Sequence, residues 1–179
     1  RPGIWAFWWP RFQTMGWRFL EIEEERQGRH ETLATEIMGE LPINEGPWPF
    51  ILKARADRLD RDLESGDIEI IDYTTGSPPQ KRKIEAGFAP QLPLEGWMVN
   101  KGAFSPLPPS DVARLSFWQL RGTREPIEIK HIAGHKEQIS ASREGFLSLL
   151  ARFSRPETPY LSNPRPAYAG YGDYDHLAR

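Results

Sequence analysis

The sequence contains no cysteine, which excludes disulfide bonds, thiolate zinc sites and cysteine-ligated iron–sulfur clusters. It has no apolar run near the roughly 20 residues that a membrane-spanning helix requires, and no signal-peptide pattern opens it. An excess of positive charge is also missing, because the formal net charge is −2. These absences predict a cytoplasmic protein without a membrane partner, in which any contact with nucleic acid is local or is supplied by a partner.

Several common active-site patterns are absent as well. There is no nucleotide-binding glycine-rich loop, no Ser-His-Asp arrangement and no internal repeat. The histidines do not follow metal-ligand spacing, so we interpret all four as structural or surface residues: His30, His131, His135 and His176. The chain of 179 residues has 39% apolar and 12% aromatic residues, which predicts a folded domain with a substantial core.

The most informative stretch runs from residue 50 to residue 76 and reads as two strands joined by a turn at residues 64–67. Successive side chains of a strand point to opposite faces, so Lys53 and Asp57 are expected on one face of the first strand. If the strands pair antiparallel, Asp57 and Asp72 converge on one face of the hairpin.

Two carboxylates held side by side on a rigid hairpin form a site for a hard divalent cation, because Mg²⁺ takes oxygen ligands and keeps part of its water shell. The alternative is that Asp57 and Asp72 are ordinary solvent-facing residues at the ends of strands.

Three segments in order extend this pattern: Ala-Arg-Ala-Asp-Arg-Leu-Asp at 54–60, Ile-Ile-Asp-Tyr-Thr-Thr-Gly at 70–76, and Ala-Pro-Gln-Leu-Pro-Leu-Glu at 89–95. They resemble the C-terminal nuclease domain of the B subunit (AddB) of AddAB-type helicase–nucleases, in the RecB-like branch of the PD-(D/E)XK superfamily. The resemblance implies an α/β, restriction-endonuclease-like fold with a central mixed β-sheet flanked by helices. It also implies a nuclease-like domain at 1–155, with core motifs at 50–98, and an extended C-terminal tail at 156–179.

The resemblance further implies a metal-dependent DNA exonuclease domain acting in double-strand break repair. Asp57 and Asp72 would hold Mg²⁺ or Mn²⁺, with a backbone carbonyl near Tyr73 completing the shell. Gln91 would lie beside the active site and hold metal-bound water or the DNA backbone; the alternative is a helix-start residue exposed to water. The implied partners are single-stranded DNA, an AddA-like helicase–nuclease subunit and the remainder of a parent AddB chain.

One position departs from the family, whose third motif reads Asp-Tyr-Lys-Thr-Gly: Thr74 stands where the catalytic lysine is expected. Threonine carries no charge and is too short to replace lysine. Lys53 or Lys83 could supply a substitute charge. Three interpretations stay open: an active nuclease with a substitute lysine, a catalytically inactive nuclease fold serving DNA binding or assembly of the complex, and a threonine introduced in place of a natural lysine.

A further acid often joins the metal site from the first motif of the superfamily. Three residues are candidates: Glu23 and Glu25 on a helix predicted from Pro10 to about Arg29, and Glu36 on a strand predicted from Leu33 to Ile43. The first helix is preceded by an aromatic cluster of Trp5, Phe7, Trp8 and Trp9, which could stack on single-stranded DNA but which we expect to be core or to dock on the parent chain.

The segment after the third motif is expected to begin a helix, because Ser77-Pro78-Pro79-Gln80 resembles a capping box. Lys81, Arg82 and Lys83 would open this helix, where cations oppose the macrodipole. Contact with DNA phosphates would explain this placement, and a solvated basic run is the alternative. Later in the chain, alternation predicts a second hairpin of strands at 112–121 and 127–131.

Overall fold

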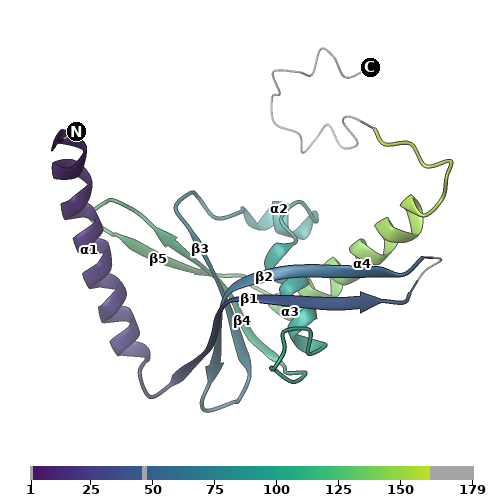
Figure 1. The fold of residues 1–179 in the computed structure, drawn as a ribbon, viewed down its shortest axis with the longest axis horizontal. Coiled ribbons are helices and arrows are strands. Elements are labelled where there is room, and N and C mark those ends of the chain that lie inside the picture. Colours follow the sequence, from purple (N-terminus) through teal and green to yellow (C-terminus); the bar gives the residue numbers. More distant parts are fainter. Residues whose placement is uncertain (1, 46–47, 162–179) are drawn as a thin grey trace.

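The computed structural model describes residues 2–45 and 48–161. Its elements are α1 (Pro2–Arg26), β1 (His30–Ile43), β2 (Phe50–Asp62), β3 (Ile68–Thr74), α2 (Lys81–Glu85), α3 (Gln91–Asn100), β4 (Val112–Leu120), β5 (Ile127–His131) and α4 (His135–Phe153) (Figure 1). Most of the predicted tail, and His176 with it, lie outside the described residues.

The five strands form one mixed sheet in the order β1-β2-β3-β4-β5. All neighbours are antiparallel except β3 and β4, which are parallel and are connected through α2 and α3. The predicted mixed sheet flanked by helices is therefore confirmed, and so are both predicted hairpins. Residues 58–61 of β2 pair with residues 68–71 of β3, from Arg58 opposite Ile71 to Arg61 opposite Ile68. Beyond this region β2 continues with β1 as a long two-stranded ribbon.

The turn between β2 and β3 is stabilised by its own first residue. The Oδ1 atom of Asp62 accepts hydrogen bonds from the backbone N–H groups of Glu64 and Ser65, at 3.0 and 3.1 Å. Gly66 follows at φ 80°, a left-handed conformation that glycine adopts without a steric penalty. These local preferences fix the hairpin that carries the candidate site.

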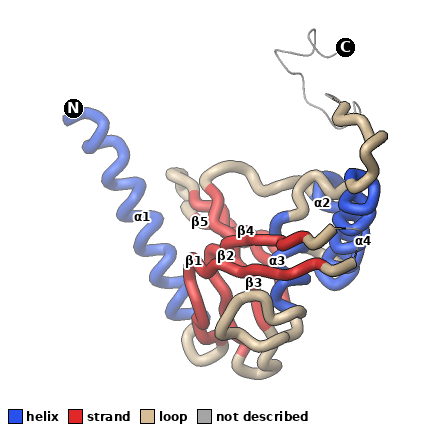
Figure 2. Tube along the Cα trace, turned by 45° about the vertical axis from the view of Figure 1, so that its right-hand side comes forward, coloured by secondary structure: helices blue, strands red, loops and turns tan. Residues whose placement is uncertain are grey.

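Helices cover both faces of the sheet (Figure 2). On one face α3, with α4 outside it, packs on a large core that includes Leu59, Ile70, Trp97, Met98, Leu115 and Ile139. On the other face the last turns of α1 pack on a smaller cluster of Ile22, Ile71 and Trp118. The alternation of β3 explains both cores, because Ile70 points to one face and Ile71 to the other.

Helices α3 and α4 approach closely at Gly96. A Cβ atom added there would lie 2.7 Å from Cδ1 of Ile139, so Gly96→Ala is expected to lower the free energy of unfolding by about 1–3 kcal/mol. Gly145 on α4 is the matched control, because an added Cβ meets nothing within 4 Å. Gly145→Ala should instead raise the free energy of unfolding by up to about 1 kcal/mol, because alanine has the higher helix propensity. Urea denaturation measures the free energy of unfolding of both variants, and equal changes in the two would contradict this expectation.

Two predicted helix starts are wrong. Helix α1 begins at Pro2 and contains Pro10, so Pro10 does not mark its first turn. Helix α2 begins at Lys81, and its N-cap residue Gln80 makes no side-chain cap hydrogen bond, so the capping box of residues 77–80 does not form. The two consecutive prolines explain this error, because Pro79 disfavours a helical conformation of the residue before it. β1 also starts earlier than predicted, at His30 rather than Leu33.

The N-terminal part of α1 stands away from the sheet (Figures 1 and 2). Its large apolar side chains are exposed, for example Trp5 at 64%, Trp8 at 58% and Trp17 at 69%. Several of these rings contact one another, and Trp5 stacks on Trp9 with ring centroids 4.8 Å apart. The aromatic cluster is therefore not part of the core of this domain.

Candidate metal centre

Asp57 and Asp72 lie together at the end of the paired region of β2 and β3. The last recorded pair is Arg58 with Ile71, so one further step of the same register sets the two aspartates opposite each other. The backbone N–H of Tyr73 donates to Oδ2 of Asp57 at 2.9 Å. From α3, Nε2 of Gln91 donates to Oδ1 of Asp72 at 2.9 Å. The structure thus brings Tyr73 and Gln91 together with the two predicted metal ligands, Asp57 and Asp72.

The surroundings of Asp72 disfavour its charged form. Burial and the charge of Asp57 raise the pKa of Asp72 to about 6, and the hydrogen bond from Gln91 opposes this shift only in part. None of the groups that set this pKa is a cation. Within residues 2–45 and 48–161 neither Asp57 nor Asp72 forms an ion pair, which is the electrostatic condition that a bound cation would relieve.

The sequence analysis missed a third acid of the site, Glu95. It follows Gln91 by four residues on α3 and is only 2% exposed. Burial raises the pKa of Glu95 to about 8; a hydrogen bond with Gln91 opposes the shift, and the charges of Asp72 and Asp57 add to it. The signal was its spacing, because residues four apart share one helix face.

The residues present fit a hard divalent cation. Carboxylate oxygens are the preferred protein ligands of Mg²⁺, which binds through one or two carboxylates and retains several waters. Within residues 2–45 and 48–161, no group of three or more His, Cys, Asp or Glu side chains could hold a metal ion by itself. Asp57 and Asp72 would therefore hold the cation, with water and backbone oxygen filling the other positions.

Thr74 ends β3, and its hydroxyl contacts the backbone of the turn that follows. Its Oγ1 accepts a hydrogen bond from the backbone N–H of Gly76 at 3.2 Å. Its neighbour in the β3–β4 register is Gln119, and the guanidinium of Arg121 donates to Oε1 of Gln119 at 2.5 Å. Arg121 also pairs with Glu128 at 2.6 Å, so its charge is engaged on the far side of Thr74 from Asp57.

Lys53 lies on the long β1–β2 ribbon, where its Nζ is 2.6 Å from Oε1 of Glu40 and both side chains are exposed. Ala56 and Leu59, three residues apart, both enter the same core, so the side chains of β2 do not alternate strictly between the two faces. That Lys53 shares a strand face with Asp57 stays a prediction.

The basic run on α2 is exposed. Lys81 pairs with Glu85 at 3.6 Å, whereas Arg82 and Lys83 form no ion pair with any residue that the structure describes. Lys83 therefore remains available as a substitute cation or as a contact for DNA phosphate.

Of the three candidate first-motif acids, Glu23 and Glu25 do not lie beside Asp57 and Asp72, whereas the register of β1 with β2 sets Glu36 opposite Asp57, so Glu36 stays a candidate. Glu25 is exposed and pairs with Arg18 at 3.4 Å. Glu36 is exposed too, has a positive φ of 53° and pairs with Arg55 across the ribbon. Glu23 lies on the opposite face of the sheet, where it accepts two hydrogen bonds from Arg58, at 2.6 and 2.9 Å.

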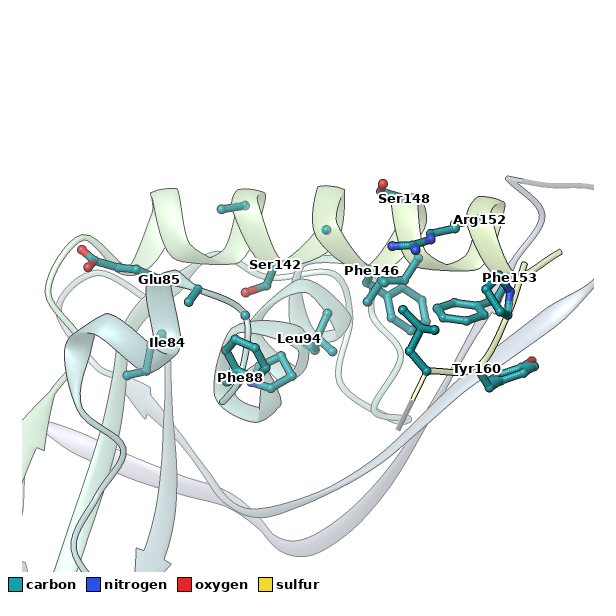
Figure 3. Close-up of a pocket in the computed structure, with 18 residues that line it drawn as sticks. Ile84, Glu85, Phe88, Leu94, Ser142, Phe146, Ser148, Arg152, Phe153 and Tyr160 are labelled. Carbon is teal, nitrogen blue, oxygen red and sulfur yellow. The ribbon is translucent and has the colours of Figure 1, made fainter. Parts of the chain in front are cut away.

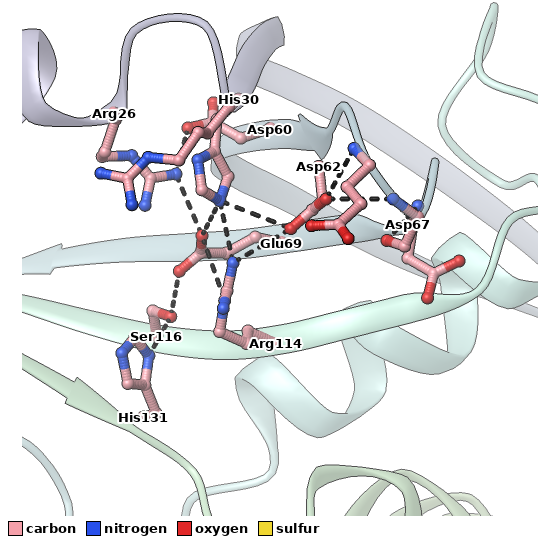
Figure 4. Close-up of polar contacts among 12 residues, drawn as sticks. Arg26, His30, Asp60, Asp62, Asp67, Glu69, Arg114, Ser116 and His131 are labelled. Carbon is pink, nitrogen blue, oxygen red and sulfur yellow. Dashed lines mark hydrogen bonds and ion pairs between the residues drawn. The ribbon is translucent and has the colours of Figure 1, made fainter.

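Glu23 belongs to a largely buried ionic network under the end of α1, part of which is shown in Figure 4. At its centre Asp60 and Glu69 are cross-strand neighbours, both fully buried. Arg26 bridges them, at 2.8 Å from Asp60 and 3.0 Å from Glu69. Around Glu69 the network continues through Arg114, Ser116, His30 and His131. It fastens α1 to the sheet directly behind the acidic site.

Arg58 is the central cation of this network. Burial opposes its charge, but hydrogen bonds to Glu23, Asp60 and Tyr73 raise the pKa of Arg58 above its ordinary value. Arg58→Met would leave Asp60 and Glu23 without this partner and is expected to cost about 3–5 kcal/mol of unfolding free energy. Arg55→Met on the same strand removes an exposed pair and should change it by less than about 0.5 kcal/mol. Similar denaturation midpoints for the two variants would contradict this assignment.

A pocket of about 520 Å³ lies elsewhere, between α2, α4 and the chain after α4 (Figure 3). Its lining is mainly apolar and includes Ile84, Phe88, Leu94, Phe146 and Tyr160. None of the acidic residues of the candidate metal centre lines it.

Comparisons with known proteins agree with this geometry. The family model of the PD-(D/E)XK nuclease superfamily matches residues 5–173. An uncharacterized protein of Rickettsia bellii is 26% identical over 187 residues, and one of Rickettsia felis is 31% identical over 198 residues. These matches cover 95% and 90% of this chain but only 22% of each relative. The chain thus spans about a fifth of the length of these relatives.

Among solved structures, the crystal structure of SSO0001 is 15% identical with a TM-score of 0.38, covering 79% of this chain and 68% of that chain. Among the residues that the structure describes, no helix combines the length and the apolar character that spanning a bilayer requires.

Proposed function

Because this chain belongs to the PD-(D/E)XK nuclease superfamily, we propose that it is a nuclease domain that hydrolyses DNA phosphodiester bonds with a divalent cation at Asp57 and Asp72. Nucleases of this superfamily generally use divalent metal ions. The observation that carries the proposal is the pair of carboxylates itself. They lie together where β2 and β3 separate, and none of the groups that shift the pKa of Asp72 is a cation.

The residues of the chain have separate tasks in this mechanism. Asp57 and Asp72 hold the cation, which, when bound, lowers the pKa of a water ligand and neutralises charge on the phosphate during in-line attack. The backbone N–H of Tyr73 fixes the carboxylate of Asp57, and Gln91 fixes that of Asp72. Thr74 offers only a neutral hydroxyl, so a positive charge that orients the attacking water would have to come from another residue such as Lys83.

The finer assignment is to the AddB-type nuclease domain, with Mg²⁺ or Mn²⁺ as the cation and single-stranded DNA as the substrate in double-strand break repair. The three motifs at 54–60, 70–76 and 89–95 support it. This chain covers 22% of each of these relatives, which agrees with a domain carried by a larger chain. The proposal takes the nuclease domain as residues 1–155 with a following tail, and an AddA-like subunit as the partner of the larger chain. The exposed run of Lys81, Arg82 and Lys83 would contact the DNA phosphates.

A second candidate function is a nuclease fold that binds DNA or helps to assemble the complex without cutting. Thr74 favours it, because losing one preorganised charge of this kind typically costs about 10²–10³ in rate. The two candidate functions share the same fold and differ in whether the domain cleaves DNA.

The test is degradation of labelled single-stranded DNA by the chain with Mg²⁺ or Mn²⁺, alongside the Asp57→Ala variant and an excess of chelator. Cleavage that requires the metal and is lost in the variant supports the nuclease. DNA binding without cleavage supports the second candidate. Cleavage that survives both the chelator and the substitution would overturn the assignment of the site.

A further inference from the structure

We propose that Glu95 is a positioning residue of this site, which holds the side-chain amide of Gln91 in the orientation that donates to Asp72. The inference rests on the proposed function and deepens it, because it assigns a role to Glu95, the last residue of the third segment at 89–95.

The geometry of α3 brings the three groups into one chain of contacts. Gln91 and Glu95 are four residues apart on the helix and therefore share a face. The amide nitrogen of Gln91 carries two N–H groups. One donates to Oδ1 of Asp72 at 2.9 Å, and the other can reach Glu95 one turn further along α3, in agreement with the lowering effect of Gln91 on the pKa of Glu95. Gln91 thus bridges an acid of the sheet and an acid of its own helix.

Gln91 needs such a second anchor because it is exposed at the first residue of α3. A long, exposed side chain loses rotamer freedom when it is held in one conformation, and one hydrogen bond offsets this loss only weakly. Glu95 is itself fixed, since it is 2% exposed and its neighbours Gly96 and Trp97 are buried against the core. It can therefore hold Gln91 firmly.

The burial of Glu95 is better explained by a function of this residue than by a contribution to stability. A carboxyl group buried close to two other acids is unfavourable for folding, whereas leucine or methionine at this position would add to the core. Its raised pKa agrees with this cost. Buried acids with perturbed pKa values in such surroundings are characteristic of functional sites.

The first test measures Gln91 directly and requires neither metal nor activity. In ¹H–¹⁵N spectra of the metal-free chain, the side-chain amide protons of Gln91 should exchange slowly and resonate apart from those of solvated glutamines. Glu95→Ala should move them to the solvated values, and Glu95→Gln should keep them displaced, because its Oε1 still accepts a hydrogen bond. Unchanged Gln91 signals in Glu95→Ala would overturn the proposal.

The second test uses Mn²⁺ affinity and turnover on labelled single-stranded DNA. Outer-shell partners of metal ligands typically contribute 10–100-fold, so Glu95→Ala and Gln91→Ala should each weaken Mn²⁺ binding or kcat by about 10-fold or more, with KM for DNA little changed. The double variant should be no worse than Gln91→Ala alone, because Glu95 acts through Gln91. If the losses in the two single variants add in the double variant, Glu95 does not act through Gln91.

Met98→Ala is the control for lost packing, since Met98 is fully buried on the same helix and is not among the site residues. It should lower stability without changing Mn²⁺ affinity. Asp72→Ala separates the two proposals. If it leaves Mn²⁺ binding and cleavage intact, the proposed function fails, and the spectra still decide whether Glu95 holds Gln91.

Discussion

Replacing Thr74 by lysine is expected to raise the rate of metal-dependent DNA cleavage by about 10²–10³-fold. Position 74 lies two residues after Asp72 on β3, so its side chain projects from the same face of the strand. None of the groups that shift the pKa of Asp72 is a cation, and a lysine here would supply a positive charge. Single-turnover cleavage of labelled single-stranded DNA, at saturating Mg²⁺, measures the gain.

Thr74→Met is the matched control, because it lengthens the side chain without adding charge. It should not increase the rate. If Thr74→Lys also fails to increase the rate while Asp72→Ala abolishes cleavage, the required charge comes from elsewhere, and Lys83→Met becomes the next variant to measure.

Replacing Asp72 by asparagine is expected to weaken Mn²⁺ binding by more than about 100-fold, because it removes a direct carboxylate ligand. The same substitution should raise the melting temperature of the metal-free protein. The pKa of Asp72 is about 6 in the folded protein, above its ordinary value of 3.8, so the folded state binds the proton more tightly than the unfolded state. Stability is then lost as the pH rises through 6.

The stabilisation by Asp72→Asn should therefore be present above pH 6 and should vanish below about pH 4, where Asp72 is protonated in both states. Mn²⁺ affinity of the unsubstituted protein should fall as the pH drops below 6, since the ligand must be deprotonated. Thermal unfolding and calorimetric titration over this pH range check both trends. A melting temperature that is insensitive to the substitution at neutral pH would show that Asp72 is not strained in the folded state.

The central hairpin could be predicted from the sequence because its signals are local. The turn has an aspartate and a glycine at positions with clear conformational requirements, and strand alternation then places Asp57 and Asp72 on one face. Strict alternation does not hold along all of β2, since Ala56 and Leu59, three residues apart, enter the same core. A departure of this kind leaves little mark on the sequence.

The charged residues of the interior could not be predicted from local patterns. Glu23 and Arg58 are 35 residues apart, and nothing near either residue indicates its partner. Arg58 looks like a solvent-facing strand residue, although it is 6% exposed. Glu95 similarly resembles an ordinary helix acid, and only its spacing from Gln91 indicates the site.

The two faces of β2 carry different groups of charged residues. Asp57 contributes to the acidic site on one face, while the next residue, Arg58, holds Glu23 and Asp60 on the other. Arg58 also lies 3.3 Å from the hydroxyl of Tyr73, whose backbone N–H fixes Asp57. The position of the metal ligands therefore depends on the attachment of α1 behind them.

The ionic attachment involves only the last turns of α1, and Arg11 lies against Gly122 between β4 and β5, which has a consequence for the helix before Arg11. Residues 3–10 include Gly3 and Pro10, which disfavour helix, and exposed aromatic rings. A short helical segment of this kind is marginal in water. In the chain studied by itself, amide hydrogens of residues 3–10 should exchange within seconds, while those of residues 19–26 remain protected for much longer. The boundary between the two would locate where tertiary support begins.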